Sequence, residues 1–177
     1  MTSSATLFDT WNLIAAVIVM AVLLSNLADW LRSRAYTQKV AAEAFRAHLA
    51  AVEKIIDDPA LPVEVVRFVA DFNFVVSNKR SAHEFYKIMM TSEREKVRES
   101  GLTDTLNTLS RTRPDLVEGV LMAVSKGLLS MLYRTSPNVK QIDDFIACLA
   151  TEPRREIQVA SKVVKSQSLN HANLVAA

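Results

Sequence analysis

The chain has 177 residues, half of them hydrophobic, and its 21 Lys and Arg residues against 19 Asp and Glu residues give a net charge of +2. This apolar content excludes an intrinsically disordered protein, and the length allows one domain beside a membrane segment. Only three glycines occur, a scarcity that argues against the turn-rich chains of β-sandwiches and barrels and predicts an all-α fold.

The first predicted element is a single transmembrane helix over residues 11–31. Residues 13–24 read LIAAVIVMAVLL, without one polar side chain, and Trp11 and Trp30 flank this run. Helical steps of ~1.5 Å place the two indoles roughly 28 Å apart, close to the ~30 Å hydrocarbon thickness of a bilayer. Tryptophan favours the membrane boundary because its ring is apolar while its N–H needs a partner. We therefore interpret Trp11 and Trp30 as membrane anchors.

The basic residues predict the orientation of this helix. Arg32, Arg34 and Lys39 follow it directly, whereas residues 1–31 contain no Lys or Arg. By the positive-inside rule, residues 1–10 are extracytoplasmic and the C-terminal part is cytoplasmic. A cleaved signal peptide is the alternative, but such peptides begin with basic residues, which are absent here. The Ala- and Val-rich composition, without eukaryotic targeting signals, favours the inner (plasma) membrane of a bacterium.

Polar groups near the end of the span offer contacts to a second transmembrane helix. Ala21 and Ser25 form a small-x-x-x-small step that would let another helix approach, and Asn26 and Asp29 add hydrogen-bonding groups. Two other interpretations of Asp29 stay open at this point: it pairs with Arg32 three residues on, or it reaches headgroup water.

Residues 32–168 are predicted to form a cytoplasmic bundle of about six helices. The five prolines each lie near a plausible helix start, where the missing N–H has no helical acceptor anyway. An amphipathic helix continues from the membrane to about residue 56, and a third helix opens with the capping-box pair Ser81 and Glu84 and stops at Gly101. The remaining predictions are helices at 62–77, 114–134, 137–150 and 153–168, a short segment at 103–110 and a disordered tail at 169–177.

Two residues with reactive side chains receive structural interpretations. His48 lies on the apolar face of the amphipathic helix, without Cys, Asp, Glu or another His three or four residues away. We therefore predict a hydrogen-bonded core residue and not a metal ligand. The single cysteine, Cys148, lies in the apolar run FIACL and has no internal disulfide partner, which permits a reducing compartment.

Small residues recur on one face of the predicted helix 114–134. Gly119, Ala123 and Gly127 follow one another at four-residue steps, and glycine inside a helix costs about 1 kcal/mol relative to alanine. The pattern indicates close packing of another backbone, either within the bundle or from a partner helix that docks in a groove. A second membrane crossing is disfavoured because Lys126 would lie near mid-bilayer.

The last predicted helix is basic and amphipathic. Arg154, Arg155, Lys162 and Lys165 alternate with aliphatic residues. Such a helix can rest on anionic lipid, which a tethered domain reaches easily, and the competing interpretation is an ordinary solvated face.

The sequence holds no catalytic motif, no metal-ligand spacing and no cofactor fingerprint. Acidic residues interleave with the basic ones, which argues against nucleic acid as a partner. We predict a non-enzymatic interaction protein, either an accessory or assembly subunit of a membrane complex or a docking platform for a cytosolic partner. The alternatives are a ligand-binding or regulatory domain with an apolar pocket between its two most apolar helices, and a membrane-tethered enzyme.

Overall fold

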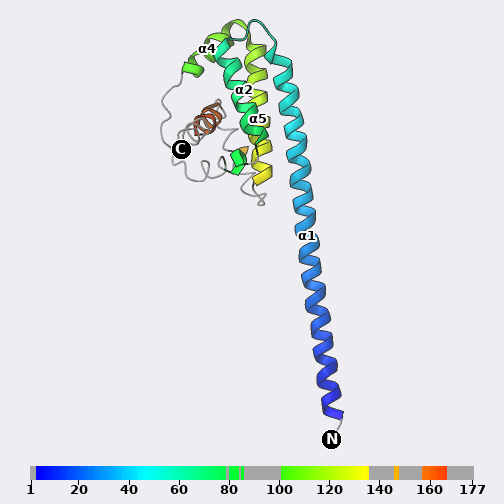
Figure 1. Ribbon diagram of the computed structural model, residues 1–177. Helices are drawn as coiled ribbons and strands as arrows, with labels where there is room; N and C mark the ends of the chain where they lie inside the picture. The colour runs from blue at the N-terminus through cyan, green and yellow to red at the C-terminus, as the bar shows by residue number, and fades with distance from the viewer. Residues whose placement is uncertain are drawn as a thin grey trace. The chain divides into compact units, whose positions relative to one another are not determined.

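The computed structural model describes residues 3–78, 80–83, 85, 101–135, 146–147 and 157–166, with side chains from residue 11 onward. All regular structure in these ranges is α-helical, and the predicted all-α fold class is confirmed. Four helices have defined bounds (Figure 1): α1 is Ser3–Ile56, α2 is Val63–Ser77, α4 is Gly101–Thr112 and α5 is Pro114–Thr135.

The chain divides into two compact units. Unit 1 is Met1–Thr37 and unit 2 is Gln38–Ala177. Helix α1 contributes residues to both, because no proline occurs before Pro59 and no glycine before Gly101 to interrupt it. Its predicted end near residue 56 agrees with the structure.

A short turn separates α1 from α2. The Asp58 N–H donates to the Ile55 carbonyl at 3.2 Å, and the Asp58 side-chain Oδ1 accepts from the Ala60 N–H at 2.8 Å. Such side-chain bonds to the backbone are the usual reason why Asp occurs in turns. Pro62 then precedes the first turn of α2 and its carbonyl accepts from the Val65 N–H at 2.9 Å, so α2 begins where proline is tolerated.

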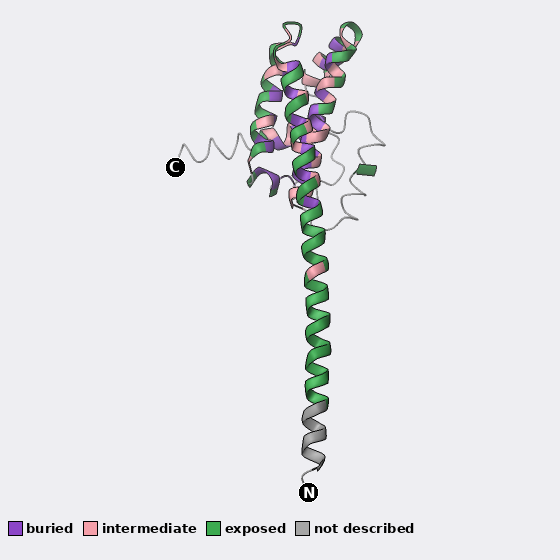
Figure 2. Cartoon of the chain, turned by 90° about the vertical axis from the view of Figure 1, so that its right-hand side faces the viewer, coloured by how far each residue is buried: buried purple, intermediate pink, exposed green. Residues whose placement is uncertain are grey.

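Unit 2 is a helical bundle with one hydrophobic core. Helix α2 packs against α4 and α5, α4 also packs against α5, and the part of α1 within unit 2 contributes Val52 and Ile55 to the same core. Figure 2 shows the buried residues, in purple, along these helices of unit 2. The largest of those fully buried are Phe72, Phe85, Leu128, Met131, His48, Val65, Val69, Val76, Val120, Val124 and Val163.

Arg134 joins three helices of unit 2. Its guanidinium donates to the Val76 carbonyl at 2.9 Å, in the last turn of α2, and lies 5.1 Å above the centre of the Phe45 ring of α1. A cation satisfies the free carbonyl groups at a helix C-terminus and is favoured there by the helix dipole. Partial burial lowers the pKa of Arg134, but the guanidinium keeps its charge because its ordinary pKa is so high.

Arg113, between α4 and α5, forms ion pairs at the end of unit 2 where α1 stops. It pairs with Asp58 of the turn after α1 at 3.0 Å and with Asp115 of the first turn of α5 at 2.8 Å. The pKa of Asp58 is lowered by the hydrogen bond from the Ala60 N–H and by Arg113, and Arg113 lowers the pKa of Asp115 as well. Both carboxylates therefore stay ionised and paired over the physiological pH range.

The structure corrects the interpretation of residues 101–112. Gly101 was expected to stop the third helix, and residues 103–110 to form only a short segment, but Gly101 is the first described residue of the twelve-residue helix α4. Leu106 and Leu109 are buried on one side of this helix, so tertiary packing of an amphipathic face outweighs the low helix propensity of glycine.

Several predicted features lie outside the described residues. These are the capping-box acceptor Glu84, most of the helix predicted at 137–150 including Cys148, the basic pair Arg154 and Arg155, and the tail 169–177.

Candidate functional site

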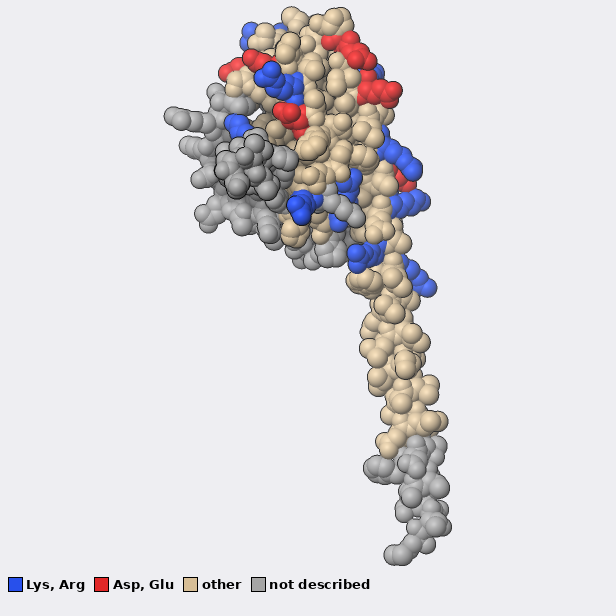
Figure 3. Space-filling view, in the orientation of Figure 1, with Lys and Arg blue, Asp and Glu red and all other residues tan. Residues whose placement is uncertain are grey.

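Unit 1 exposes a long, mainly apolar surface. Its side chains from residue 11 to 36 are exposed, apart from the half-buried Ala28, and Figure 3 shows a long stretch of α1 without a charged atom. This stretch is long and apolar enough to cross a membrane, with none of its apolar window buried. The exposed large side chains are Trp11, Leu13, Ile14, Val17, Ile18, Val19, Met20, Val22, Leu23, Leu24, Leu27, Trp30 and Leu31.

Charged side chains gather at the C-terminal end of this apolar surface. Arg32 pairs with Asp29 at 3.2 Å, both exposed, so the structure contains the ion pair that was one of the predicted alternatives. The Arg34 guanidinium lies 5.1 Å above the centre of the Trp30 ring, a cation–π arrangement. Trp11, at the other end, is 69% exposed.

The polar face proposed to contact a second transmembrane helix is open in the structure. Ala21, Ser25, Asn26 and Asp29 are all exposed. Their contact with a partner helix stays a prediction.

Helix α5 also has the length and apolarity of a membrane span, but half of its most apolar window is buried inside unit 2. Val120, Val124 and Leu128 are completely buried there. Burial of this ridge against the other helices explains its apolarity without a membrane.

The small-residue face of α5 packs inside unit 2. A Cβ atom added to Gly119 would lie 2.5 Å from Ile55 Cγ2 of α1, and one added to Gly127 would lie 2.6 Å from Phe72 Cε1 of α2. Ala123, between the two glycines, is 1% exposed. The chain's own helices therefore fill the surface that had been considered as a docking groove.

His48 lies at the centre of the bundle, as expected for a core residue. It is fully buried, and its Nδ1 lies 2.7 Å from the Ala123 carbonyl oxygen of α5 while its Nε2 lies 3.2 Å from Asn73 Oδ1 of α2. A carbonyl only accepts, so Nδ1 carries a proton and donates to Ala123. The ring of Phe72 meets the imidazole edge-on, with 5.8 Å between the centroids.

The protonation state of His48 determines which atom of the Asn73 side-chain amide faces the ring. A neutral ring protonated on Nδ1 accepts at Nε2, so Asn73 has to turn its amide nitrogen toward the ring. An imidazolium instead donates to both oxygens. Burial lowers the pKa of His48, although its bonds to Ala123 and Asn73 oppose the shift, so the neutral ring is the stable form at neutral pH.

This shift gives a pH-dependent stability. The unfolded chain binds a proton on His48 at higher pH than the folded chain does, so the free energy of unfolding falls as the pH drops below about 6.5. We expect thermal melts followed by circular dichroism to show a larger loss between pH 7 and pH 5 for the wild type than for His48→Gln. Equal losses in the two proteins would contradict this assignment.

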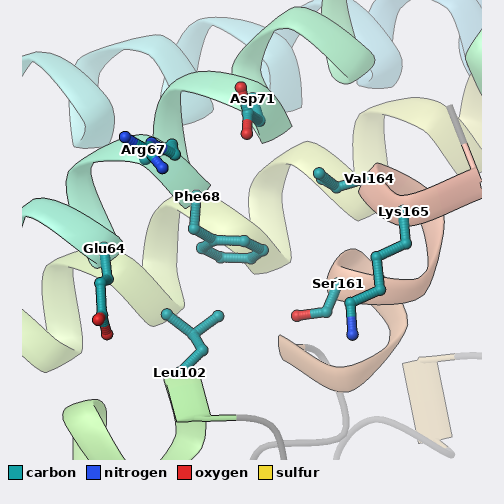
Figure 4. Close-up of a pocket in the computed structure, with 8 residues that line it drawn as sticks. All are labelled: Glu64, Arg67, Phe68, Asp71, Leu102, Ser161, Val164 and Lys165. Atoms are coloured by element: carbon teal, nitrogen blue, oxygen red, sulfur yellow. The ribbon is translucent and has the colours of Figure 1, made fainter. Parts of the chain in front are cut away.

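A cleft of about 210 Å³ opens beside α2 (Figure 4). Helix α2 supplies four of the lining residues, α4 supplies one and the helical segment 157–166 supplies three. The lining residues are Glu64, Arg67, Phe68, Asp71, Leu102, Ser161, Val164 and Lys165.

The cleft has an apolar floor and a charged rim. Phe68 is 8% exposed, and Leu102 and Val164 are half-buried, while the charged lining residues are exposed. Thr105 of α4 donates to the Glu64 carboxylate at 3.1 Å, which holds one side of the rim to α4.

The buried hydroxyl of Ser161 has no hydrogen-bond partner among the residues that the structure describes. Figure 4 shows it directed toward Phe68 and Leu102. It forms part of one wall of the cleft.

The apolar pocket that the sequence offered as an alternative, between the two most apolar helices, stays a prediction. Where α2 and α5 meet at Gly127, Phe72, Val76 and His48 leave no room for even one added Cβ atom. The observed cleft depends on where segment 157–166 returns to α2, a long-range contact that no local pattern encodes. The one sequence signal for it is the run of Glu64, Arg67 and Asp71 at helical spacing around Phe68.

Two residues of the predicted lipid-binding face belong to this region. Lys165 is exposed at the rim of the cleft and Lys162 is half-buried. Ile157, Ala160 and Val163 of the same segment face the core. Contact of these lysines with anionic lipid stays a prediction.

Within the described ranges, no group of three or more His, Cys, Asp or Glu side chains is arranged to hold a metal ion. Comparison with protein-family models, with curated protein sequences and with solved structures finds no match to this chain.

Proposed function

We propose that this chain is a membrane-anchored, non-enzymatic interaction protein whose helical bundle serves as a docking platform for a cytosolic partner or as an assembly subunit of a membrane complex. The observation that carries the proposal is the exposed apolar surface of unit 1. Leaving this many large aliphatic and aromatic side chains in water is unfavourable, at roughly 25 cal/mol for each Å² of apolar surface, and a lipid bilayer removes the cost. Exposed patches of this size mark interaction or membrane surfaces.

The basic residues support an orientation with the N-terminus outside. Arg32 and Arg34 are exposed immediately after the apolar stretch, and Lys39 follows. Retention of such residues on the cytoplasmic side is the basis of the positive-inside rule. This orientation places unit 2 in the cytoplasm, and the Ala- and Val-rich composition without eukaryotic targeting signals favours the inner membrane of a bacterium.

The interaction role is supported by the polar contacts inside the bundle that follows the anchor. The polar contacts of its interior are accounted for by packing: His48 bonds to Ala123 and Asn73, and Ser130 donates to the Ala41 carbonyl at 3.0 Å. These groups hold helices together within the part of the bundle that the structure describes, which supports a structural role for them. A stable scaffold on an anchor is suited to presenting a surface to another protein.

Two measurements on the full chain test the proposal. Protease added to intact cells should leave unit 2 uncut, and protease added to inside-out vesicles should digest it. Purification of the tagged chain in a mild detergent should recover a protein partner in stoichiometric amount. Digestion of unit 2 in intact cells would refute the orientation, and a chain that purifies alone from its native membrane would refute the docking role.

A further inference from the structure

The cleft beside α2 is too small and too open for an enclosed small molecule. Ligand pockets usually measure about 300 to 1,000 Å³ and bury most of the ligand, whereas this cleft measures about 210 Å³ and has an exposed rim. A cavity of about 150 Å³ admits a benzene ring. The space therefore suits a single large apolar side chain carried by a larger partner.

The chemistry of the cleft fits the anchor residue of a protein interface. Its floor is formed by Phe68, Leu102 and Val164, all apolar, and charged side chains surround them. Interfaces concentrate their binding energy in such desolvated pockets, which a surrounding polar ring shields from water.

Two rim charges are available to a partner. Arg67 and Asp71 lie one turn apart on α2, both exposed, and neither makes an ion pair within the part of the chain that the structure describes. They place one positive and one negative charge one helical turn apart on the surface of α2. A partner helix with a carboxylate and an ammonium group at the same spacing would complement both.

The same side of α2 carries apolar groups beyond the cleft. Val63, four residues before Arg67, is 74% exposed, and Phe74, seven residues after it, is 57% exposed. An α-helix laid along α2 would cover these groups together with the cleft, as helices do in grooves of other recognition domains. An anionic membrane surface is a poorer occupant, because the two carboxylates of the rim balance its two cations and leave no net positive charge to attract it. These four charged side chains are Glu64, Asp71, Arg67 and Lys165.

From these observations we propose that the cleft formed by Phe68, Leu102, Ser161 and Val164 is the docking site for an amphipathic helix of a protein partner. The partner inserts one large apolar side chain into the cleft and places an acidic group over Arg67 and a basic group over Asp71. This inference rests on the proposed docking function and assigns that function to one surface.

A synthetic helix tests the site directly. The probe is a lactam-bridged helical peptide that carries a Glu and a Lys one turn apart, the spacing of Arg67 and Asp71, and a Phe between them; the reference peptide has Ala in place of Phe. Binding to the full chain in lipid nanodiscs is measured by fluorescence anisotropy. We expect the Phe peptide to bind at least tenfold more tightly than the Ala peptide, and Leu102→Trp, which fills the cleft, to remove the difference.

A charge reversal tests the rim without touching the core. The variant Arg67→Asp/Asp71→Arg should weaken binding of the probe at least fivefold and prefer a peptide in which Glu and Lys are exchanged. The matched control, Glu43→Arg/Arg46→Glu, reverses two exposed charges on α1 and should bind as the wild type does. The Arg67→Asp/Asp71→Arg variant keeps the proposal testable if Leu102→Trp fails to fold.

The proposal is overturned if the Phe and Ala peptides bind equally, or if both cleft variants bind the probe as the wild type does. It is also overturned if vesicles of anionic lipid displace the probe fully and the unlabelled Phe peptide does not.

Failure of the docking function itself is distinguished by co-purification of the natural partner. If the natural partner still co-purifies with both cleft variants, the docking function stands and the partner binds elsewhere; if no partner co-purifies with the wild type, the docking function fails.

Discussion

Two arginines in the middle of the apolar stretch should detach the chain from the membrane. Met20 and Ala21 lie midway between Trp11 and Trp30, where a membrane-spanning α1 would be farthest from water on either side. An arginine at the centre of a span costs about 2.5 to 3.5 kcal/mol on the insertion scale, so Met20→Arg/Ala21→Arg costs about 5 to 7 kcal/mol. That penalty is large enough to leave most of the protein uninserted.

The measurement is flotation of alkali-washed vesicles through a density gradient, which separates inserted protein from aggregates. The wild type should float with lipid and the double-arginine variant should stay at the bottom or in the soluble fraction. Met20→Leu/Ala21→Leu should float. Ala42→Arg/Ala50→Arg adds the same charge at exposed positions of α1 outside the apolar stretch and should float as well. If the Met20→Arg/Ala21→Arg protein floats with lipid, the span does not lie where we assign it.

The elements predicted correctly are those whose signals are local. The end of α1 follows from Asp57, Asp58 and Pro59, and the start of α5 follows from Pro114, because turn chemistry and the geometry of proline act within a few residues. The core position of His48 also follows from local periodicity, since it lies on the apolar face of its helix.

The features missed by sequence reasoning depend on contacts between distant segments. Helix α4 begins at Gly101, a residue typical of helix ends, and is held by burial of Leu106 and Leu109 in a core built from other helices. The cleft likewise needs Ser161 and Val164 to return to α2. Neither a propensity nor a spacing within one segment specifies which distant segment will pack against it.

The small-residue face of α5 was predicted only in part. The four-residue spacing of Gly119, Ala123 and Gly127 correctly indicates the approach of another backbone, but it does not identify that backbone. The structure assigns the contact to Ile55 of α1 and Phe72 of α2. A pattern of small residues therefore predicts close packing, and the packed surface becomes known only with the fold.

Gly127→Val should destabilise unit 2 more than any exposed substitution. Even a single Cβ atom at Gly127 would lie 2.6 Å from Phe72 Cε1, 3.0 Å from Val76 Cγ2 and 3.1 Å from His48 Nδ1, and valine adds two further methyl groups. These neighbours are fully buried, so they have no open space to move into. Overpacking of this kind costs about 3 kcal/mol, and we expect a melting temperature about 6 to 12 °C lower in thermal melts of the full chain in mild detergent.

Two further variants show whether the loss comes from this contact. Gly101→Val adds the same side chain at the start of α4, where no atom lies within 4 Å of the added Cβ, and should change the melting temperature little. Phe72→Leu removes the ring atom nearest to Gly127. The Gly127→Val/Phe72→Leu protein should therefore lose less melting temperature than the sum of the losses of the two single variants, because the smaller leucine side chain makes room for the added valine. Strict additivity would mean that Gly127 and Phe72 are not in contact and that α2 and α5 pack in a different register.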